Sequence, residues 1–227
     1  GYQIVNGGQT LRTIYEFAKH NFDEESLSSS EILIRIFQTE SDRVLTNDIA
    51  EYTNSQNAIS SIDLKSINNL QIQIGTYLKS HNILYVRKSG DVGENNSSYT
   101  SRISMEKLAQ IIYSELGYPD RATNQKNALF EKYYDEIFNN DLDFETLIPL
   151  INDYNSIDGK YKNSKYTPSH QKYLYIIYMM KKYPSNSIEE NMNKLEDLLN
   201  KYKNDVDISP ARKLIQTGFK DFIEKKL

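Results

Sequence analysis

The sequence predicts an α+β protein that is predominantly α-helical, with a small β-sheet in its N-terminal half and a helical bundle in its C-terminal half. Every periodic segment from residue 104 onward has apolar residues at helical spacing, whereas short runs rich in β-branched residues occur before it. The chain of 227 residues is long enough to bury a core of its own. We therefore expect a boundary near residue 103, between an α/β part, residues 1–103, and a helical part, residues 104–227.

The N-terminal half alternates strand and helix signals. Residues 31–37 place Ile32, Ile34 and Ile36 on one face of a strand. The other expected strands are residues 2–5 and 83–88. Helical spacing predicts helices that begin near residues 9, 46 and 67. Residues 89–101 are rich in Gly, Asn and Ser, which predicts a loop.

The C-terminal half carries a series of apolar stripes. They predict helices that begin near residues 105, 130, 144, 169, 188 and 210. Pro149 is expected to kink or restart the third of these helices. Residues 173–180 are apolar on nearly every side, which is typical of the central helix of a bundle. Ser187 and Glu190 have the spacing of a capping box, and Ser209 is expected to cap the last helix.

The composition excludes several classes of protein. The longest apolar run, residues 173–180, is too short for a membrane span of roughly 20 residues, so no membrane partner is expected. The chain has no Cys, which excludes disulfide frameworks and thiolate zinc sites and favours a cytoplasmic location. The net charge of −4 requires any nucleic-acid site to be local. Because the chain begins with Gly1 rather than Met, we expect a fragment whose upstream region is a partner within the same protein.

Residues 4–10 read Ile-Val-Asn-Gly-Gly-Gln-Thr, which predicts a strand, a glycine turn and the start of a helix. Such a turn leaves unpaired backbone N–H groups at the positive end of the helix dipole, so it can hold a phosphate or a carboxylate. The alternative is a turn without a ligand, because glycine turns before helices are common. The expected binding residues are Asn6, Gly7, Gly8, Gln9 and Thr10, together with Arg12 on the helix that follows.

Residues 53–59 read Thr-Asn-Ser-Gln-Asn-Ala-Ile, and Asp63 and Leu64 follow. Asn and Gln side chains carry donors and acceptors, so a cluster of them can recognise base edges or ribose. The alternative is a helix end stabilised by bonds from side chains to the backbone, and these residues alone favour it. The expected binding residues are Thr53, Asn54, Gln56 and Asn57. We hypothesise that both motifs face one cleft.

The two motifs together resemble the abortive-infection phage-resistance (AIPR) family of bacterial defence proteins, and the resemblance extends to about residue 138. It implies a role in restricting phage through nucleic acid or a nucleotide, but supplies no established reaction, catalytic residue or cofactor. A fainter similarity connects residues 7–11 with the Asp-Gly-Gln-His-Arg turn of ParB-like and DGQHR proteins. Gly7, Thr10 and Leu11 replace its Asp, His and Arg, and Arg12 is the nearest basic substitute.

A basic stretch gives a second candidate for nucleic-acid binding. Residues 159–188 contain six Lys, six Tyr and no acidic residue, which suits phosphate contacts and base stacking. The acidic stretch before it, residues 131–158, could instead neutralise it across helix faces. The expected patch residues are Lys160, Lys162, Lys165 and Lys172.

A metal-dependent nuclease is a weaker alternative. Asp120 and Asp158 with Lys160 formally fit the pattern of such enzymes, but both acids are expected between helices rather than on strands. The histidines, His20, His81 and His170, show no spacing of metal ligands and are expected at the surface or in helix caps. The other alternative is a non-catalytic scaffold or protein-interaction module, in which the Asn and Gln side chains would be buried and paired internally.

Overall fold

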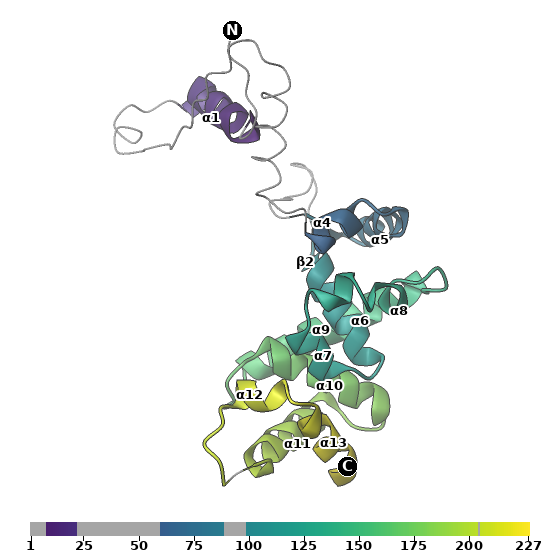
Figure 1. Ribbon diagram of the computed structural model, residues 1–227, viewed down its shortest axis with the longest axis vertical. Helices are drawn as coiled ribbons and strands as arrows, with labels where there is room; N and C mark the ends of the chain where they lie inside the picture. The colour runs from purple at the N-terminus through teal and green to yellow at the C-terminus, as the bar shows by residue number, and fades with distance from the viewer. Residues whose placement is uncertain (1–7, 22–59, 89–98, 204) are drawn as a thin grey trace, which may run out of the picture. The chain divides into compact units, whose positions relative to one another are not determined.

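The structure is a computed structural model that describes residues 8–21, 60–88, 99–203 and 205–227 (Figure 1). The chain divides into two compact units, residues 1–59 and residues 60–227, and we describe each by itself. The described residues confirm the predicted class, because they are mainly helical and contain a small sheet before residue 105. The boundary near residue 103 stays a prediction.

In the first unit, the described residues form the helix α1 (Gly8–Asn21), which confirms the helix predicted to begin near residue 9. The strands expected at residues 2–5 and 31–37 lie outside the described residues. The helix expected from residue 46 lies outside them as well.

The second unit begins with α4 (Ser61–Ser66), which the sequence analysis does not predict, and α5 (Asn69–Ser80), which confirms the helix predicted to begin near residue 67. The side chain of Asn68 accepts a hydrogen bond from the N–H of Leu70 at 3.0 Å, so α5 begins with its own cap. Ile74 and Leu78, one helical turn apart on α5, are fully buried.

The sheet consists of two parallel strands, β1 (Ile83–Val86) and β2 (Ser101–Ser104), with Ile83 opposite Ser101. β1 confirms the strand predicted from residue 83, and all four of its residues are buried. β2 corrects the prediction of a loop up to residue 101. Only Ile103 of β2 is buried, so this strand has no apolar alternation that a sequence pattern could reveal.

The chain turns directly from the sheet into helices. The hydroxyl of Ser104 accepts a hydrogen bond from the N–H of Lys107 and caps α6 (Met105–Glu115), and α7 (Pro119–Asn124) follows. The next segment forms a 3₁₀ turn, η1 (Ala128–Phe130), and one turn of helix, α8 (Tyr134–Ile137), which corrects the helix predicted to begin near residue 130. Glu131, with φ −117° and ψ −89°, interrupts the helical backbone.

The C-terminal half packs around one helix, α10, as the sequence predicts. Its elements are η2 (Phe144–Thr146), α9 (Leu147–Lys162), α10 (His170–Lys182), α11 (Ile188–Lys201), α12 (Pro210–Leu214) and α13 (Thr217–Lys226). α10 contacts α6, α7, α9, α11 and α12, and residues 173–179 are buried. Pro149 lies in the first turn of α9, where its missing N–H has no helical partner to lose.

The start of α11 and the break between α12 and α13 are both set by local backbone features. The capping box of Ser187 and Glu190 at the start of α11 is confirmed, with the two reciprocal hydrogen bonds at 3.2 and 2.7 Å. The last predicted helix is divided into α12 and α13, because Gln216 between them has extended backbone.

Within the described ranges, every helix is too short or too polar to span a bilayer.

Candidate functional site

The glycine turn and the Asn/Gln cluster are only partly placed by the structure. Gly8 is the first residue of α1, and Thr10 and Arg12 are exposed on that helix. Arg12 lines a surface hollow of about 530 Å³ together with Thr13, Glu16 and Phe17. The side chain of Gln9 is not described. The remaining predicted residues, Asn6, Gly7, Thr53, Asn54, Gln56 and Asn57, lie outside the described residues, so their convergence on one cleft stays a prediction.

The lysines of the basic stretch mostly have acidic partners. Lys162 Nζ lies 2.6 Å from Asp158 Oδ2 one helical turn earlier, and Lys160 Nζ lies 3.2 Å from Glu189 Oε1 on α11. Lys165 forms no ion pair with a described residue, and its Nζ lies 5.3 Å from the ring centroid of Tyr166. Among the acidic partners of the predicted patch lysines, Asp158 on α9 belongs to the acidic stretch at residues 131–158, whereas Glu189 and Glu196 lie on α11.

Lys172 differs from the other three predicted patch lysines because it is buried. Only 6% of the residue is exposed, and its Nζ lies 2.7 Å from Glu196 Oε1 and donates to the carbonyl of Thr167 at 3.0 Å. The ammonium also lies 5.7 Å from the ring centroid of Tyr161, whose burial raises its pKa. Lys172 thus joins α10 to α11 inside the core, where a surface ligand does not reach it.

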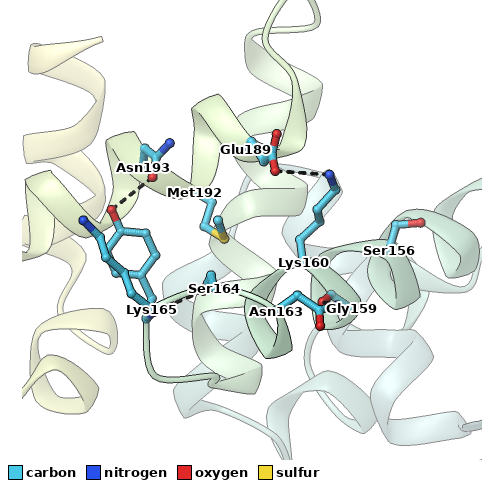
Figure 2. A pocket seen from close by; sticks show the side chains of 10 residues that line it. Ser156, Gly159, Lys160, Asn163, Ser164, Lys165, Glu189, Met192 and Asn193 are labelled. Carbon is cyan, nitrogen blue, oxygen red and sulfur yellow. Dashed lines mark hydrogen bonds and ion pairs between the residues drawn. The ribbon is translucent and has the colours of Figure 1, made fainter.

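The exposed lysines of this stretch border a groove between the end of α9 and the start of α11 (Figure 2). The groove has a volume of about 690 Å³. Its lining residues are Ser156, Gly159, Lys160, Asn163, Ser164, Lys165, Tyr166, Glu189, Met192 and Asn193. Figure 2 shows the ion pair of Lys160 with Glu189 on one side and the side chains of Lys165 and Asn193 on the other.

Local hydrogen bonds fix the loop that forms one wall of the groove. Asn163 ends α9 and donates from Nδ2 to the carbonyl of Gly159 at 2.9 Å. The hydroxyl of Ser164 accepts from the N–H of Tyr166 at 3.1 Å, and the phenol of Tyr166 donates to Asn193 Oδ1 at 3.0 Å. The wall is therefore held to α11, and the Asn193 amide nitrogen has no acceptor among the described residues, so it can donate to a ligand.

A partly buried histidine forms two side-chain hydrogen bonds away from the residues that line the groove. His170, the first residue of α10, places Nε2 2.8 Å from Gln110 Oε1 and Nδ1 2.6 Å from the phenol oxygen of Tyr154. Gln110 Nε2 donates to the carbonyl of Ala122 at 2.7 Å, so its oxygen faces the ring and must accept from Nε2–H. Nδ1 then accepts from the Tyr154 hydroxyl. Burial lowers the pKa of His170 to about 4, which keeps this ring neutral.

The carboxylates considered for a nuclease have separate partners. Asp158 pairs with Lys162, which lowers the pKa of that carboxyl. Asp120 is buried in α7, and its Oδ2 accepts a hydrogen bond from the Thr217 hydroxyl at 3.1 Å. In the described part of the chain, no group of three or more acidic or histidine side chains lies close enough to hold a metal ion.

A comparison with protein-family models matches residues 1–226 to the model described as AIPR protein. The chain belongs to the AIPR family. The match extends well beyond the segment up to residue 138 on which the sequence resemblance depends, and it includes the groove. Comparisons of this AIPR chain with curated proteins and with solved structures gave no significant match.

The groove of this AIPR protein combines predicted and unpredicted residues. Lys160 and Lys165 belong to the predicted patch, whereas the sequence analysis does not identify Asn163, Glu189 or Asn193. Asn163 follows directly after a helix that ends in lysines, which is a local signal for a cap. The positions of Glu189 and Asn193 depend on how α11 packs against α9, and no local pattern reveals that packing.

Proposed function

We propose that this chain, as part of an abortive-infection phage-resistance protein, binds nucleic acid or a nucleotide. The observation that carries the proposal is the groove, where Lys160 and Lys165 lie beside the amides of Asn163 and Asn193. Its volume of about 690 Å³ is within the usual range of ligand pockets, roughly 300–1,000 Å³. Cations for phosphate and amides for base or sugar edges are the groups that a nucleotide requires.

The charges of the groove can be rearranged around an anion at low cost. Lys165 has no acidic partner among the described residues, so its charge is available to a phosphate. The side chains of Lys160 and Glu189 are 49% and 61% exposed, and such surface ion pairs contribute only about 0–1 kcal/mol. A bound phosphate could therefore replace Glu189 as the partner of Lys160.

The glycine turn and the Asn/Gln cluster belong to the same proposal. We expect residues 6–10 to accept an anion beside residues 53–57, because the turn precedes the N-terminus of a helix. The start of α1 at Gly8 supports this expectation, since it places the positive end of the helix dipole directly after the turn.

One observation favours the alternative of a non-catalytic scaffold. Most of the polar groups in the groove already have partners within the chain, such as Asn163 with Gly159 and Tyr166 with Asn193. Polar residues that are paired internally can serve to hold α9 against α11 without any ligand. A scaffold would keep its fold and its protein contacts while showing no affinity for nucleic acid.

Fluorescence anisotropy with labelled oligonucleotides separates the two functions. We expect the wild-type chain to bind single-stranded DNA or RNA, or a mononucleotide that competes with it. The Lys160→Gln/Lys165→Gln variant should bind about thirtyfold more weakly or worse, since each of the two lost charged contacts is worth about 1 kcal/mol or more. Lys201→Gln is the matched control, because Lys201 is an exposed lysine paired with Asp197 outside the groove. Equal affinity of all three proteins would exclude the groove, and no binding by any of them would support the scaffold.

A further inference from the structure

Three tyrosine rings form a continuous stack in the second unit, on elements that do not line the groove. The ring of Tyr113 in α6 lies between those of Tyr133 and Tyr118, with centroid distances of 5.0 and 4.8 Å and interplanar angles of 26° and 24°. Tyr113 and Tyr133 are 0% and 5% exposed, whereas Tyr118 is partly exposed. The stack therefore forms a rigid base that reaches the surface at Tyr118.

Three basic side chains lie over the outer rings of this stack. The Arg121 guanidinium carbon is 4.9 Å from the ring centroid of Tyr118 and 5.7 Å from that of Tyr133. Lys132 Nζ is 5.1 Å from the Tyr133 centroid, and Lys220 Nζ is 5.4 Å from the Tyr118 centroid. Arg121 thus shares the Tyr118 ring with Lys220 and the Tyr133 ring with Lys132, and we call these three residues the Arg121 surface.

The elements that carry the Arg121 surface are fixed against each other. α13, which contains Lys220, contacts α7, which contains Arg121 (Figure 1). The hydroxyl of Thr217 in α13 donates to Asp120 in α7 at 3.1 Å. The spacing of the cations is therefore set by the fold as well as by the rings beneath them.

Carboxylates near the Arg121 surface act on its cations without direct contact, Glu224 on Lys220 and Asp120 on Arg121. In the described ranges, none of its three cations has an ion pair, although seven other lysines do. Glu224, one helical turn after Lys220, accepts hydrogen bonds from Lys182 at 2.8 Å and from Tyr178 at 2.6 Å. Asp120, next to Arg121, is buried and bonded to Thr217.

A ring beneath a cation orients it without cancelling its charge. A cation–π contact at an exposed site is worth about 0.5–1 kcal/mol and leaves the outer side of the ammonium or guanidinium open to an anion. Arg121 can present its planar fork to two oxygens of one phosphate, while each lysine acts as a point charge. Bases cannot stack on Tyr113 or Tyr133, since both rings are buried.

We propose that the Arg121 surface contacts the phosphate backbone of a nucleic acid. The inference deepens the proposed function and rests on it, but it places phosphate contacts on α7, α13 and the residue before Tyr133, away from the groove residues. Charge complementarity carries the inference, because three neighbouring cations that form no direct ion pair with a described carboxylate fit a polyanion, although the protein has a net charge of −4. Such contacts are independent of base sequence and strongly dependent on salt.

The test measures how the affinity for oligonucleotides depends on salt, by fluorescence anisotropy with one labelled single strand and one labelled duplex. Each of the variants Arg121→Gln, Lys132→Gln and Lys220→Gln should reduce the slope of log affinity against log salt by about 0.7 for the single strand or about 0.9 for the duplex. Arg121→Lys keeps the charge and should keep most of the slope. Lys201→Gln is again the control, and thermal melting shows whether each variant is folded.

The outcomes distinguish this inference from the proposed function. The inference is wrong and the proposed function stands if the groove variant Lys160→Gln/Lys165→Gln weakens binding while the three Gln variants of the Arg121 surface keep the wild-type slope. Reduced slopes in the folded variants Arg121→Gln, Lys132→Gln and Lys220→Gln support the inference, whatever the groove variant does. A wild-type chain that binds neither oligonucleotide overturns the inference, and it overturns the proposed function as well if the chain also binds no mononucleotide.

Discussion

Acidification should destabilise the folded chain through His170. This ring is held neutral by hydrogen bonds to Gln110 and Tyr154, and burial lowers its pKa from 6.5 to about 4. In the unfolded chain the same ring takes up a proton near its ordinary pKa of about 6.5. The unfolded state therefore binds more protons than the folded state between these two pKa values, and stability falls as the pH falls through that window.

The magnitude follows from the size of the pKa shift. A shift of one pKa unit corresponds to about 1.4 kcal/mol, so His170 should cost the fold up to about 3 kcal/mol when the pH falls from about 7 to about 4. The contribution is fully present above pH 6.5 and changes no further below pH 4. Nearby Lys107 and Lys126 also lower the pKa of His170, so added salt should reduce part of the effect.

The assay is urea unfolding at a series of pH values, followed by circular dichroism, for the wild type and for His170→Gln. The variant removes this one titration and leaves those of the carboxylates, so the difference between the two free energies of unfolding isolates His170. We expect that difference to shrink by about 2–3 kcal/mol from about pH 7 to about pH 4. A difference that stays constant over this range, or a pKa of His170 near 6.5 in an NMR titration, would refute the reasoning.

Three further predictions concern the packing of the helical half. Removing the partner of buried Lys172 by Glu196→Gln should cost about 3–5 kcal/mol in urea unfolding, because an unpaired charge remains in the core; a loss below about 1 kcal/mol would show that water reaches the pair. Ser187→Ala removes a capping box and should lower stability by about 1 kcal/mol, measured in the same way, whereas an unchanged midpoint would contradict the role of the cap. Gly117 has φ +104°, so Gly117→Ala should destabilise by about 1 kcal/mol or more, and a raised melting temperature would be inconsistent with that backbone conformation.

Local signals predicted the elements whose stability depends on their own residues. Residues 173–179 are apolar on nearly every side, and they are buried in α10. The capping box at Ser187 needs only residues three apart, and it forms as predicted. The strand at residues 83–86 combines β-branched residues with complete burial, so its pattern was also sufficient.

Elements that depend on distant partners could not be predicted in this way. β2 buries only Ile103, and its existence depends on pairing with β1. The apolar residues spaced as in a helix over residues 130–138 are buried, but Tyr133 lies in a turn before α8, where its ring stacks on that of Tyr113. A pattern of apolar residues reports burial, whereas the backbone that achieves the burial is decided by tertiary contacts.

The sequence also could not predict which charged side chains of the candidate site are exposed and which are paired. The sequence presents Lys160 and Lys172 as members of one basic stretch, but the first borders an open groove and the second is buried against Glu196. Arg121 and Lys220 are far apart in the sequence and share the ring of Tyr118. Which cations are neutralised depends on the packing of α7, α11 and α13, so a count of lysines along the chain cannot reveal it.

Phage challenge of cells that carry the full-length protein tests most directly whether this AIPR chain acts by binding nucleic acid. The variants are Gln9→Ala, Asn54→Ala and Lys160→Gln/Lys165→Gln, with Lys201→Gln as the control and with the amount of folded protein measured in each strain. We predict that the first three lose protection although they remain folded, and that the control protects like the wild type. Full protection by all three folded variants would contradict a binding role for these residues.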